Sequence, residues 1–272
     1  MRGAKPERSL EKRVADEAAL QAGEVVVAAT SGGSDSGALA ALLTRVADDI
    51  GARVVLAHVN HALRASAWQD EAVALALGTA LRARTISVSL PAGSHAEARL
   101  RDERYAALVA IARRVDATRI FTAHHARDQT ESVLLALFRG AGPRGLGGMQ
   151  GKRDVAPGMT LVRPLLAIEP AELRAYLVRG QLPFALDPQN ADLAYRRNAV
   201  RAALGELRTA FPHLDAAVAR CATIVRQERE AVPRALMRER LRQELSANGS
   251  AAELTFERLD AAAKALEDAL RG

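Results

Sequence analysis

E-V-V-V-A-A-T-S-G-G-S-D-S, residues 24–36, is the part of this sequence that indicates most about the fold. Its β-branched and alanine residues are typical of a buried strand, its two glycines of a tight turn, and the alanine-rich residues 37–43 of a helix. Backbone N–H groups at a helix N-terminus have no intrahelical partner and lie at the positive end of the helix dipole. The pattern therefore predicts a site for phosphate oxygens at residues 31–36.

The residue types in this turn favour a phosphate-binding loop, with an ordinary capped polar turn as the alternative. Gly32 and Gly33 allow close approach of a ligand to the backbone. Asp35 is unusual there, because a carboxylate repels phosphate unless a cation or a reacting group lies between them. The spacing matches neither the G-x-x-x-x-G-K-[ST] loop nor the G-x-G-x-x-G turn. Hydroxyl donors are supplied by Ser31, Ser34 and Ser36.

Strand and helix patterns alternate through the first half of the chain. Further buried strands are expected at residues 53–59, 85–90 and 119–123. Helices are expected at residues 10–21, 66–84, 94–115 and 127–139. This alternation predicts an α/β fold with a doubly wound, mostly parallel sheet of the Rossmann-like kind, whose ligand lies at the carboxyl ends of the strands.

Polar clusters follow the predicted strands at the points where they end. H-V-N-H-A-L-R, residues 58–64, follows the second strand, and A-H-H-A-R-D-Q-T-E-S, residues 123–132, follows the fourth. We therefore expect these segments and the glycine-serine turn to meet in one crevice. Of the histidines at strand ends (His58, His61, His124 and His125), we expect His124 to be functional, whereas His95 and His213 are expected to be structural.

Residues 140–149, G-A-G-P-R-G-L-G-G-M, are expected to form a loop without regular structure, because of their glycines and Pro143. The loop is either an ordinary surface linker or a mobile loop that closes over a substrate.

The second half of the chain reads as mostly helical. We expect a strand at residues 160–165, a helix at 170–179, a turn at 187–190 and a helix within 192–207. That last helix carries Arg196, Arg197 and Arg201, which form either a functional cluster or a solvated basic face. From Phe211 the pattern is helical to the end, with interruptions expected at Pro233 and at Asn248-Gly249. We therefore expect a catalytic α/β domain at residues 1–210 and a small all-helical domain at residues 211–272.

The composition favours a nucleic-acid partner and an intracellular location. The chain has 272 residues and a formal net charge of +6, and arginine matches phosphate with its planar guanidinium group. Genomic base bias is the alternative source of this basicity. Cys221, the single cysteine, excludes an internal disulfide and a Cys-x-x-Cys metal site. No apolar run reaches the ~18 residues of a membrane span, so a cytoplasmic protein without membrane contact is expected.

The loop S-G-G-S-D-S resembles the S-G-G-x-D-S loop of the N-type ATP pyrophosphatases, the PP-loop superfamily. In that superfamily the loop holds the pyrophosphate end of ATP, and the enzymes cleave ATP between its α and β phosphates to adenylate a carbonyl oxygen. The resemblance implies an adenine nucleotide α-hydrolase-like fold. It also implies that Ser31, Gly32, Gly33, Ser34, Asp35 and Ser36 bind ATP, with the adenine against the end of the second strand.

Six further motifs follow one another between residues 24 and 205. They are, in order, H-V-N-H-A-L-R, A-R-L-R-D-E-R-Y, A-H-H-A-R-D-Q-T-E-S, F-R-G-A-G-P-R-G-L-G-G-M, R-P-L-L and R-R-N-A-V-R. In order and approximate spacing, residues 24–205 resemble the tRNA(Ile)-lysidine synthetases within that superfamily. These enzymes adenylate carbon 2 of the wobble cytosine in an isoleucine tRNA with a CAU anticodon, and the amino group of free L-lysine then displaces AMP to give lysidine.

This resemblance implies roles for individual residues. Asp35 and Asp128 would hold Mg²⁺, which neutralises charge on the transferring phosphoryl group. Arg104 would stabilise developing charge or orient the lysine and the base. His124 and Asp128 match the H-x-x-x-D pair of the family, and Arg197 matches an arginine in the segment that closes the site. Arg127 stands where the family usually has a carboxylate.

Alternatives to a lysidine synthetase come from the same superfamily and from outside it. A tRNA thiolase would need more cysteines than Cys221, and an amidotransferase-type synthetase would need a glutaminase domain. A non-catalytic module that binds adenine nucleotide or tRNA would not need Asp35, Arg104 and Asp128 together. Longer lysidine synthetases carry further tRNA-binding modules, so recognition of the acceptor stem is either reduced here or supplied by the second subunit of a homodimer.

Overall fold

The structure, a computed structural model, describes residues 9–60, 67–90, 97–185, 196–247 and 260–265. The expected turn at residues 187–190, His61 and His95 lie outside these ranges. The chain packs as two compact units, one comprising Met1–Glu131 and Met149–Ala216 and the other Ser132–Gly148 and Ala217–Gly272. The expected division between residues 210 and 211 stays a prediction.

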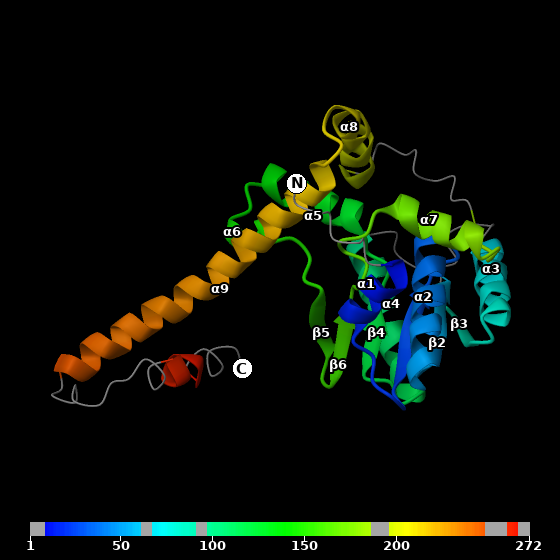
Figure 1. Ribbon diagram of the computed structural model, residues 1–272, viewed down its shortest axis with the longest axis horizontal. Coiled ribbons are helices and arrows are strands. Elements are labelled where there is room, and N and C mark those ends of the chain that lie inside the picture. The colour runs from blue at the N-terminus through cyan, green and yellow to red at the C-terminus, as the bar shows by residue number, and fades with distance from the viewer. Residues whose placement is uncertain (1–8, 61–66, 91–96, 186–195, 248–259, 266–272) are drawn as a thin grey trace, which may run out of the picture. The chain divides into compact units, whose positions relative to one another are not determined.

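The first unit contains a six-stranded sheet with the strand order β3-β2-β1-β4-β6-β5 (Figure 1). The strands are β1 (Val25–Thr30), β2 (Arg53–Asn60), β3 (Arg84–Ser89), β4 (Arg119–Phe121), β5 (Lys152–Ala156) and β6 (Met159–Val162). All neighbouring strands pair parallel except β5, which is antiparallel to β6. The predicted mostly parallel sheet is therefore confirmed.

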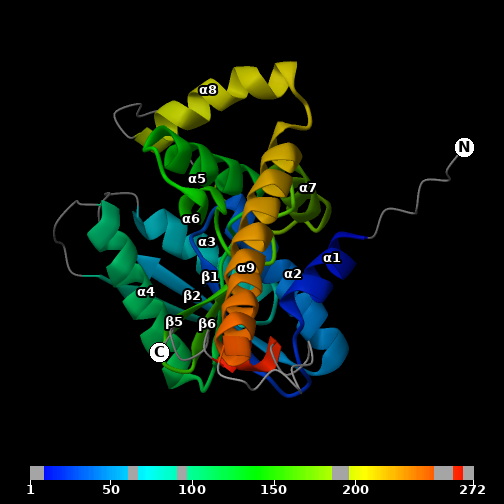
Figure 2. The same cartoon turned by 90° about the vertical axis from the view of Figure 1, so that its left-hand side faces the viewer.

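Helices cover both faces of this sheet, as a doubly wound fold requires. The helices of the first unit are α1 (Leu10–Ala18), α2 (Ser34–Ile50), α3 (Ala67–Ala80), α4 (Glu97–Arg114), α7 (Pro170–Arg179) and α8 (Arg196–Ala210), together with the start of α5 (Ala126–Phe138). In Figure 2, α4 lies on one side of β1 and β2, and α1 and α2 lie on the other.

The alternation of side chains along β1 builds two separate cores. Val26 and Ala28 pack on the side of α2, in a cluster that also contains Leu42. Val27 points to the opposite face and packs in a cluster with Leu108 of α4. Each fully buried Val or Leu side chain contributes about 1.5–3 kcal/mol, so the apolar run of β1 stabilises both layers. The strand order reverses between β1 and β4, which puts their carboxyl ends beside a crevice at one edge of the sheet.

The first unit contains one predicted element with a different end and one strand that was not predicted. The first helix ends at Ala18 rather than at residue 21, because Ala19 adopts a left-handed conformation with φ of 44° and caps it. Strand β5 was not predicted, because its sequence K-R-D-V-A is polar. It forms a hairpin with β6 through Pro157 and Gly158, and its charged residues suit the edge of a sheet.

The second unit is helical and contains two departures from expectation. Residues 140–149 are not wholly irregular, since Pro143–Leu146 form the single turn α6. Proline at the first helical position is compatible with a helix, because its missing N–H would have no partner there. The helix α9 (Leu214–Ala247), most of which lies in this unit, continues past residue 233. One proline removes a single helical hydrogen bond, and the turns on either side of it persist.

No helix in the described ranges combines the length and the apolar character needed to cross a membrane.

Candidate functional site

The glycine-serine turn forms the N-terminus of α2 at the carboxyl end of β1. Gly33 is the N-cap of α2 and has no side chain, so no side chain caps the first N–H groups of the helix. Ser36 holds the turn together. Its Oγ accepts a hydrogen bond from the Ser31 N–H at 3.0 Å and donates one to the Gly33 carbonyl oxygen at 3.1 Å. The turn is therefore preorganised, with amide groups that can bind an anion.

Gly32 meets a steric requirement that only glycine satisfies. Its φ is +89°, in the left-handed region, and a Cβ atom added there would lie 2.8 Å from the backbone oxygen of Asp70 in α3. The Gly32 carbonyl oxygen also accepts a hydrogen bond from the Ala185 N–H at 2.8 Å. The loop therefore packs closely against α3 at Gly32 and is joined to Ala185 by a backbone hydrogen bond.

Asp35 and Asp128 converge on His125, which directly precedes α5. The Nε2 atom of His125 lies 3.5 Å from Asp35 Oδ2 and 3.4 Å from Asp128 Oδ2. Burial lowers the pKa of His125, but a hydrogen bond to Asp35 and the charges of Asp128, Asp35 and Glu131 outweigh burial, so the pKa is raised. Two sequence segments therefore meet here, residues 31–36 and 123–132, and the imidazole offsets the repulsion between the carboxylates of Asp35 and Asp128.

The neighbouring histidines have different surroundings. His124 Nδ1 lies 3.0 Å from Thr122 Oγ1, so the structure brings His125 rather than His124 between the two carboxylates. His58 is buried at the end of β2, with Nδ1 2.9 Å from the Thr30 carbonyl oxygen. The sequence position of His125, adjacent to a predicted strand end, was the signal for its involvement.

A buried ion pair brings α8 to this cluster. Glu131 is 1% exposed and accepts hydrogen bonds from Arg201 at 2.7 Å (Nε to Oε1) and 3.1 Å (Nη2 to Oε2). The hydrogen bond to Glu131 raises the pKa of Arg201 above the ordinary value for arginine. Arg201 Nη2 also lies 3.9 Å from Asp128 Oδ1. The guanidinium group of Arg201 is therefore fixed beside the carboxylates. The sequence had named Arg201 only as a member of the arginine cluster at residues 196–201.

Two further predicted residues, Arg104 and Arg197, lie on α4 and α8. Arg104 is exposed on α4. Arg197 lies in α8, and its side chain lies outside the described residues. Arg127, which follows His125 by two positions, has its Nε 3.4 Å from Glu169 Oε2 at the start of α7. Arg127 therefore contacts α7, and the carboxylates next to the loop are Asp35 and Asp128.

This arrangement suits a phosphate-bearing ligand together with a hard divalent cation. Asp35 Oδ1 is buried and has no hydrogen-bond partner in the described part of the chain. Mg²⁺ is typically bound by one or two carboxylates together with phosphate oxygens and water, so Asp35 and Asp128 fit it. Across the described ranges, no cluster of three or more His, Cys, Asp or Glu side chains could hold a metal ion alone.

Comparison with known proteins identifies relatives of the first unit. Residues 4–207 match the PP-loop domain. The chain is 41% identical over 203 residues to a tRNA(Ile)-lysidine synthase of Ralstonia nicotianae, which covers 72% of this chain and 44% of that protein. It is 39% identical over 205 residues to the same enzyme of Novosphingobium aromaticivorans, covering 73% and 61%. It is 34% identical over 230 residues to that of Vibrio cholerae, covering 82% and 51%.

The chain thus spans about half the length of the curated relatives it matches. Among solved structures, it resembles the U34-tRNA thiolase NcsA of Methanococcus maripaludis with a TM-score of 0.67, over 78% of this chain and 76% of that one. The identity is 15%, so this likeness shows the shared fold alone.

Proposed function

The chain belongs to the PP-loop domain family, and from this premise we propose that it uses ATP to ligate free L-lysine to the wobble cytidine of tRNA(Ile) with a CAU anticodon. The observation that carries the proposal is the convergence of Asp35 and Asp128 beside the loop, in a chain 34–41% identical to tRNA(Ile)-lysidine synthases. The whole reaction is a proposal, because the match covers about half of each relative.

The reaction proceeds in two displacements. Oxygen 2 of the cytidine attacks the α-phosphorus of ATP, and the bond between that phosphorus and the bridging oxygen to the β-phosphate breaks, which releases pyrophosphate. The amino group of lysine then attacks carbon 2, the bond between carbon 2 and oxygen breaks, AMP leaves and the amine loses a proton. The first displacement makes a poor leaving group into a good one.

The loop and the first turn of α2 bind the phosphates. The uncapped N–H groups that follow Gly33 point to where phosphate oxygens would lie, and Ser36 holds the turn in this shape. Asp35 and Asp128 would hold Mg²⁺, whose chemistry is to neutralise negative charge on the transferring phosphoryl group. Preorganised charges of this kind stabilise the transition state without further rearrangement.

The arginines and histidines have supporting roles in the proposal. Arg201, held by Glu131, keeps a positive charge beside Asp128. Arg104 stabilises developing charge or orients the lysine and the base, His124 acts with Asp128, and Arg197 closes the site over the base. These three roles rest on the match of each residue to a family motif.

We further propose that residues 211–272 contribute to tRNA binding. Within the second unit, Arg226 of α9 donates a hydrogen bond to the Gly147 carbonyl oxygen at 2.7 Å, so the glycine segment packs with this helix. Lys and Arg side chains that neutralise phosphates release counterions, so tRNA affinity is expected to fall steeply with salt. A cytoplasmic location accords with a tRNA substrate, and a homodimer would supply a second copy of this helical part.

The experiment that tests the proposal incubates the chain with ATP, labelled lysine and unmodified tRNA(Ile) transcript, and then digests the RNA to nucleosides. We expect label in one modified nucleoside, together with AMP, and none with a methionine tRNA transcript of the same anticodon. ATP cleavage without lysine transfer would favour another PP-loop tRNA-modifying enzyme, and binding without cleavage would favour a non-catalytic module. A thiolase is disfavoured because its sulfur chemistry would need more cysteines than Cys221, the single cysteine of the chain.

A further inference from the structure

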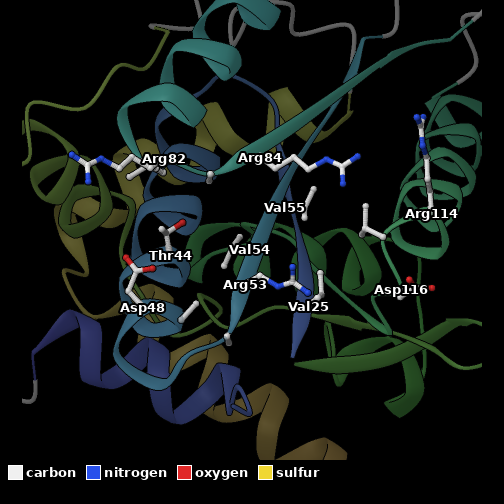
Figure 3. A pocket seen from close by; sticks show the side chains of 15 residues that line it. Val25, Thr44, Asp48, Arg53, Val54, Val55, Arg82, Arg84, Arg114 and Asp116 are labelled. Atoms are coloured by element: carbon white, nitrogen blue, oxygen red, sulfur yellow. The ribbon is translucent and has the colours of Figure 1, made fainter. Parts of the chain in front are cut away.

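A pocket lies at the amino ends of the sheet strands, whereas the glycine-serine loop lies at their carboxyl ends (Figure 3). It has a volume of about 650 Å³, within the range of small-molecule sites. The first residues of β1, β2 and β3 line this pocket, and they are Val25, Arg53 and Arg84. The six residues of β1 separate this edge from the loop by roughly 16 Å at 3.3 Å per residue, so the pocket is distinct from the proposed ATP site.

Four arginines from different parts of the first unit border this pocket. They are Arg53 at the start of β2, Arg82 after α3, Arg84 at the start of β3 and Arg114 at the end of α4.

None of these four guanidinium groups has a hydrogen bond or ion pair within the described part of the chain. Arg119, Arg201 and Arg208 behave differently, since each pairs with a carboxylate. Guanidinium groups match phosphate with two parallel hydrogen bonds, so unpaired arginines around a pocket favour a phosphate ligand.

Two of the charged residues occupy backbone conformations that favour glycine. Arg82 has φ of 52° and Asp116 has φ of 56°, both in the left-handed region. That region costs an ordinary residue about 1–2 kcal/mol. Gly51, which follows α2, shows the usual choice for such a position. Ala19 and Gln181, which follow α1 and α7, have the same conformation, so it is an ordinary way for helices of this unit to end.

The other side chains of the pocket suit the rest of a nucleotide. Thr44 and Asp48 project from α2, and Asp116 follows α4 on the other side (Figure 3). Thr44 Oγ1 is buried and has no hydrogen-bond partner among the described residues. Carboxylates and a hydroxyl accept hydrogen bonds from ribose hydroxyls or base amino groups. Val54 and Leu81 add apolar wall. An inorganic phosphate would leave these acceptors and walls without a partner.

We infer that this pocket binds a nucleotide, with its phosphate on Arg53 and Arg84 and its ribose and base against α2 and the strand ends. The nucleotide is either a free mononucleotide or one unit of an RNA strand, which share this chemistry. The inference does not depend on the proposed ligase activity, because the pocket lies at the amino ends of the strands and the proposed ATP site lies at their carboxyl ends.

The test is amide hydrogen exchange on the full chain, with the loop first saturated by a non-hydrolysable ATP analogue. The probes are UMP and a short RNA hairpin. We expect one of them to protect residues 51–53, 81–84 and 114–117, which border the pocket. Protection by UMP identifies a free nucleotide, and protection by the hairpin alone identifies RNA. Failure of both probes to protect these segments, while the analogue protects residues 31–36, would overturn the inference.

A charge-matched pair of variants separates the pocket from general electrostatic attraction. Arg53→Glu with Arg84→Glu should weaken binding of the protective probe by about tenfold or more, because charge-assisted hydrogen bonds are lost. Arg139→Glu with Arg179→Glu makes the same change in net charge at exposed arginines outside the pocket and should have a much smaller effect. Equal losses in the two pairs would show that the pocket has no specific role. If the first pair fails to fold, Arg53→Gln with Arg84→Gln replaces it.

Discussion

Gln129 and Met149 exchange two hydrogen bonds. The Met149 N–H donates to Gln129 Oε1 at 2.8 Å, and Gln129 Nε2 donates to the Met149 carbonyl oxygen at 3.1 Å. Gln129 is 4% exposed and directly follows Asp128 on α5. The side-chain amide of Gln129 forms the pair of hydrogen bonds with the Met149 backbone that a neighbouring strand would form in a sheet. It thereby holds the chain where the glycine segment ends and the first unit resumes.

We predict that Gln129→Leu lowers the free energy of unfolding by about 1–3 kcal/mol, because two backbone groups of Met149 lose their partner in Gln129. Chemical denaturation monitored by circular dichroism measures this change. Gln150→Ala is the matched control, since that side chain is exposed and its replacement should change stability by less than about 0.5 kcal/mol. Equal effects of the two substitutions would contradict the role of this hydrogen-bond pair.

The second prediction concerns Gly32, whose added Cβ would lie 2.8 Å from the Asp70 backbone oxygen. Gly32→Ala must displace the loop or α3, so we expect ATP affinity to fall by about tenfold or more. Gly51→Ala is the control, because Gly51 also has a positive φ, of 74°, but has open space around it. This control should lose only about 1–2 kcal/mol of stability and keep its ATP affinity. Calorimetric titration with ATP distinguishes the clash from backbone strain alone.

The third prediction concerns Asp35, whose Oδ1 is buried without a hydrogen-bond partner among the described residues. Asp35→Asn should lower the rate of tRNA adenylation by about 10²–10³-fold, the usual loss when a group that stabilises a transition state is removed. The fold should persist, because the side chain is 35% exposed. Asp49→Asn, at an exposed carboxylate of the same helix, should leave the rate unchanged. Near-normal turnover of Asp35→Asn at saturating magnesium would remove the assigned role.

The fourth prediction concerns stability at acid pH. Burial raises the pKa of Asp215, but hydrogen bonds from Arg208 and Thr130 and the charge of Arg208 outweigh it, so the pKa lies below its ordinary value of 3.8. A depressed pKa stabilises the fold above the unfolded pKa and ceases to do so as pH falls through the folded one. We therefore expect this contribution to be complete near neutral pH and to be lost progressively below about pH 4.

The Asp215→Asn variant tests this contribution. Arg208 and Asp215 are joined by hydrogen bonds of 2.7 Å and 2.9 Å, and both side chains are mostly buried. At neutral pH the variant should lose about 3 kcal/mol, the lower end for a broken buried pair, because asparagine can still accept one hydrogen bond. In strong acid the difference from the unsubstituted protein should shrink. A difference in unfolding free energy that did not change with pH would show that Asp215 remains charged, or is uncoupled, in this range.

Local structure was largely predictable, because its determinants lie close together in the sequence. The helix predicted at residues 170–179 is α7, which begins with Pro170 and carries a capping box between Glu169 and Glu172. The β1-loop-α2 unit was predicted for the same reason, since a β-branched strand, two glycines and an alanine-rich helix adjoin. Strand β5 was not predicted, although the Pro157-Gly158 pair, a typical turn sequence, lies between β5 and β6 and was a signal for a hairpin.

The site could be predicted only in part, because contacts between distant residues depend on the order of the strands. The residue pattern pointed to Asp35, and the family resemblance added Asp128, yet His125 joins them in the structure. Adjacent residues at a strand end point in different directions, and periodicity alone does not say which of two histidines faces the crevice. Whether His124 acts in the reaction remains a prediction.

The alternation of strands and helices and the position of the anion-binding turn follow from the sequence alone, because hydrophobic periodicity and glycine conformation are local properties. Which side chains meet depends instead on the packing of the folded chain. Asp35, Glu131 and Arg201 are far apart in the chain, and they come together because β1 and β4 are neighbours in the sheet and α8 packs against the start of α5. Those contacts arise when burial of the two sheet faces outweighs the entropy of closing long loops, a balance that no single segment contains.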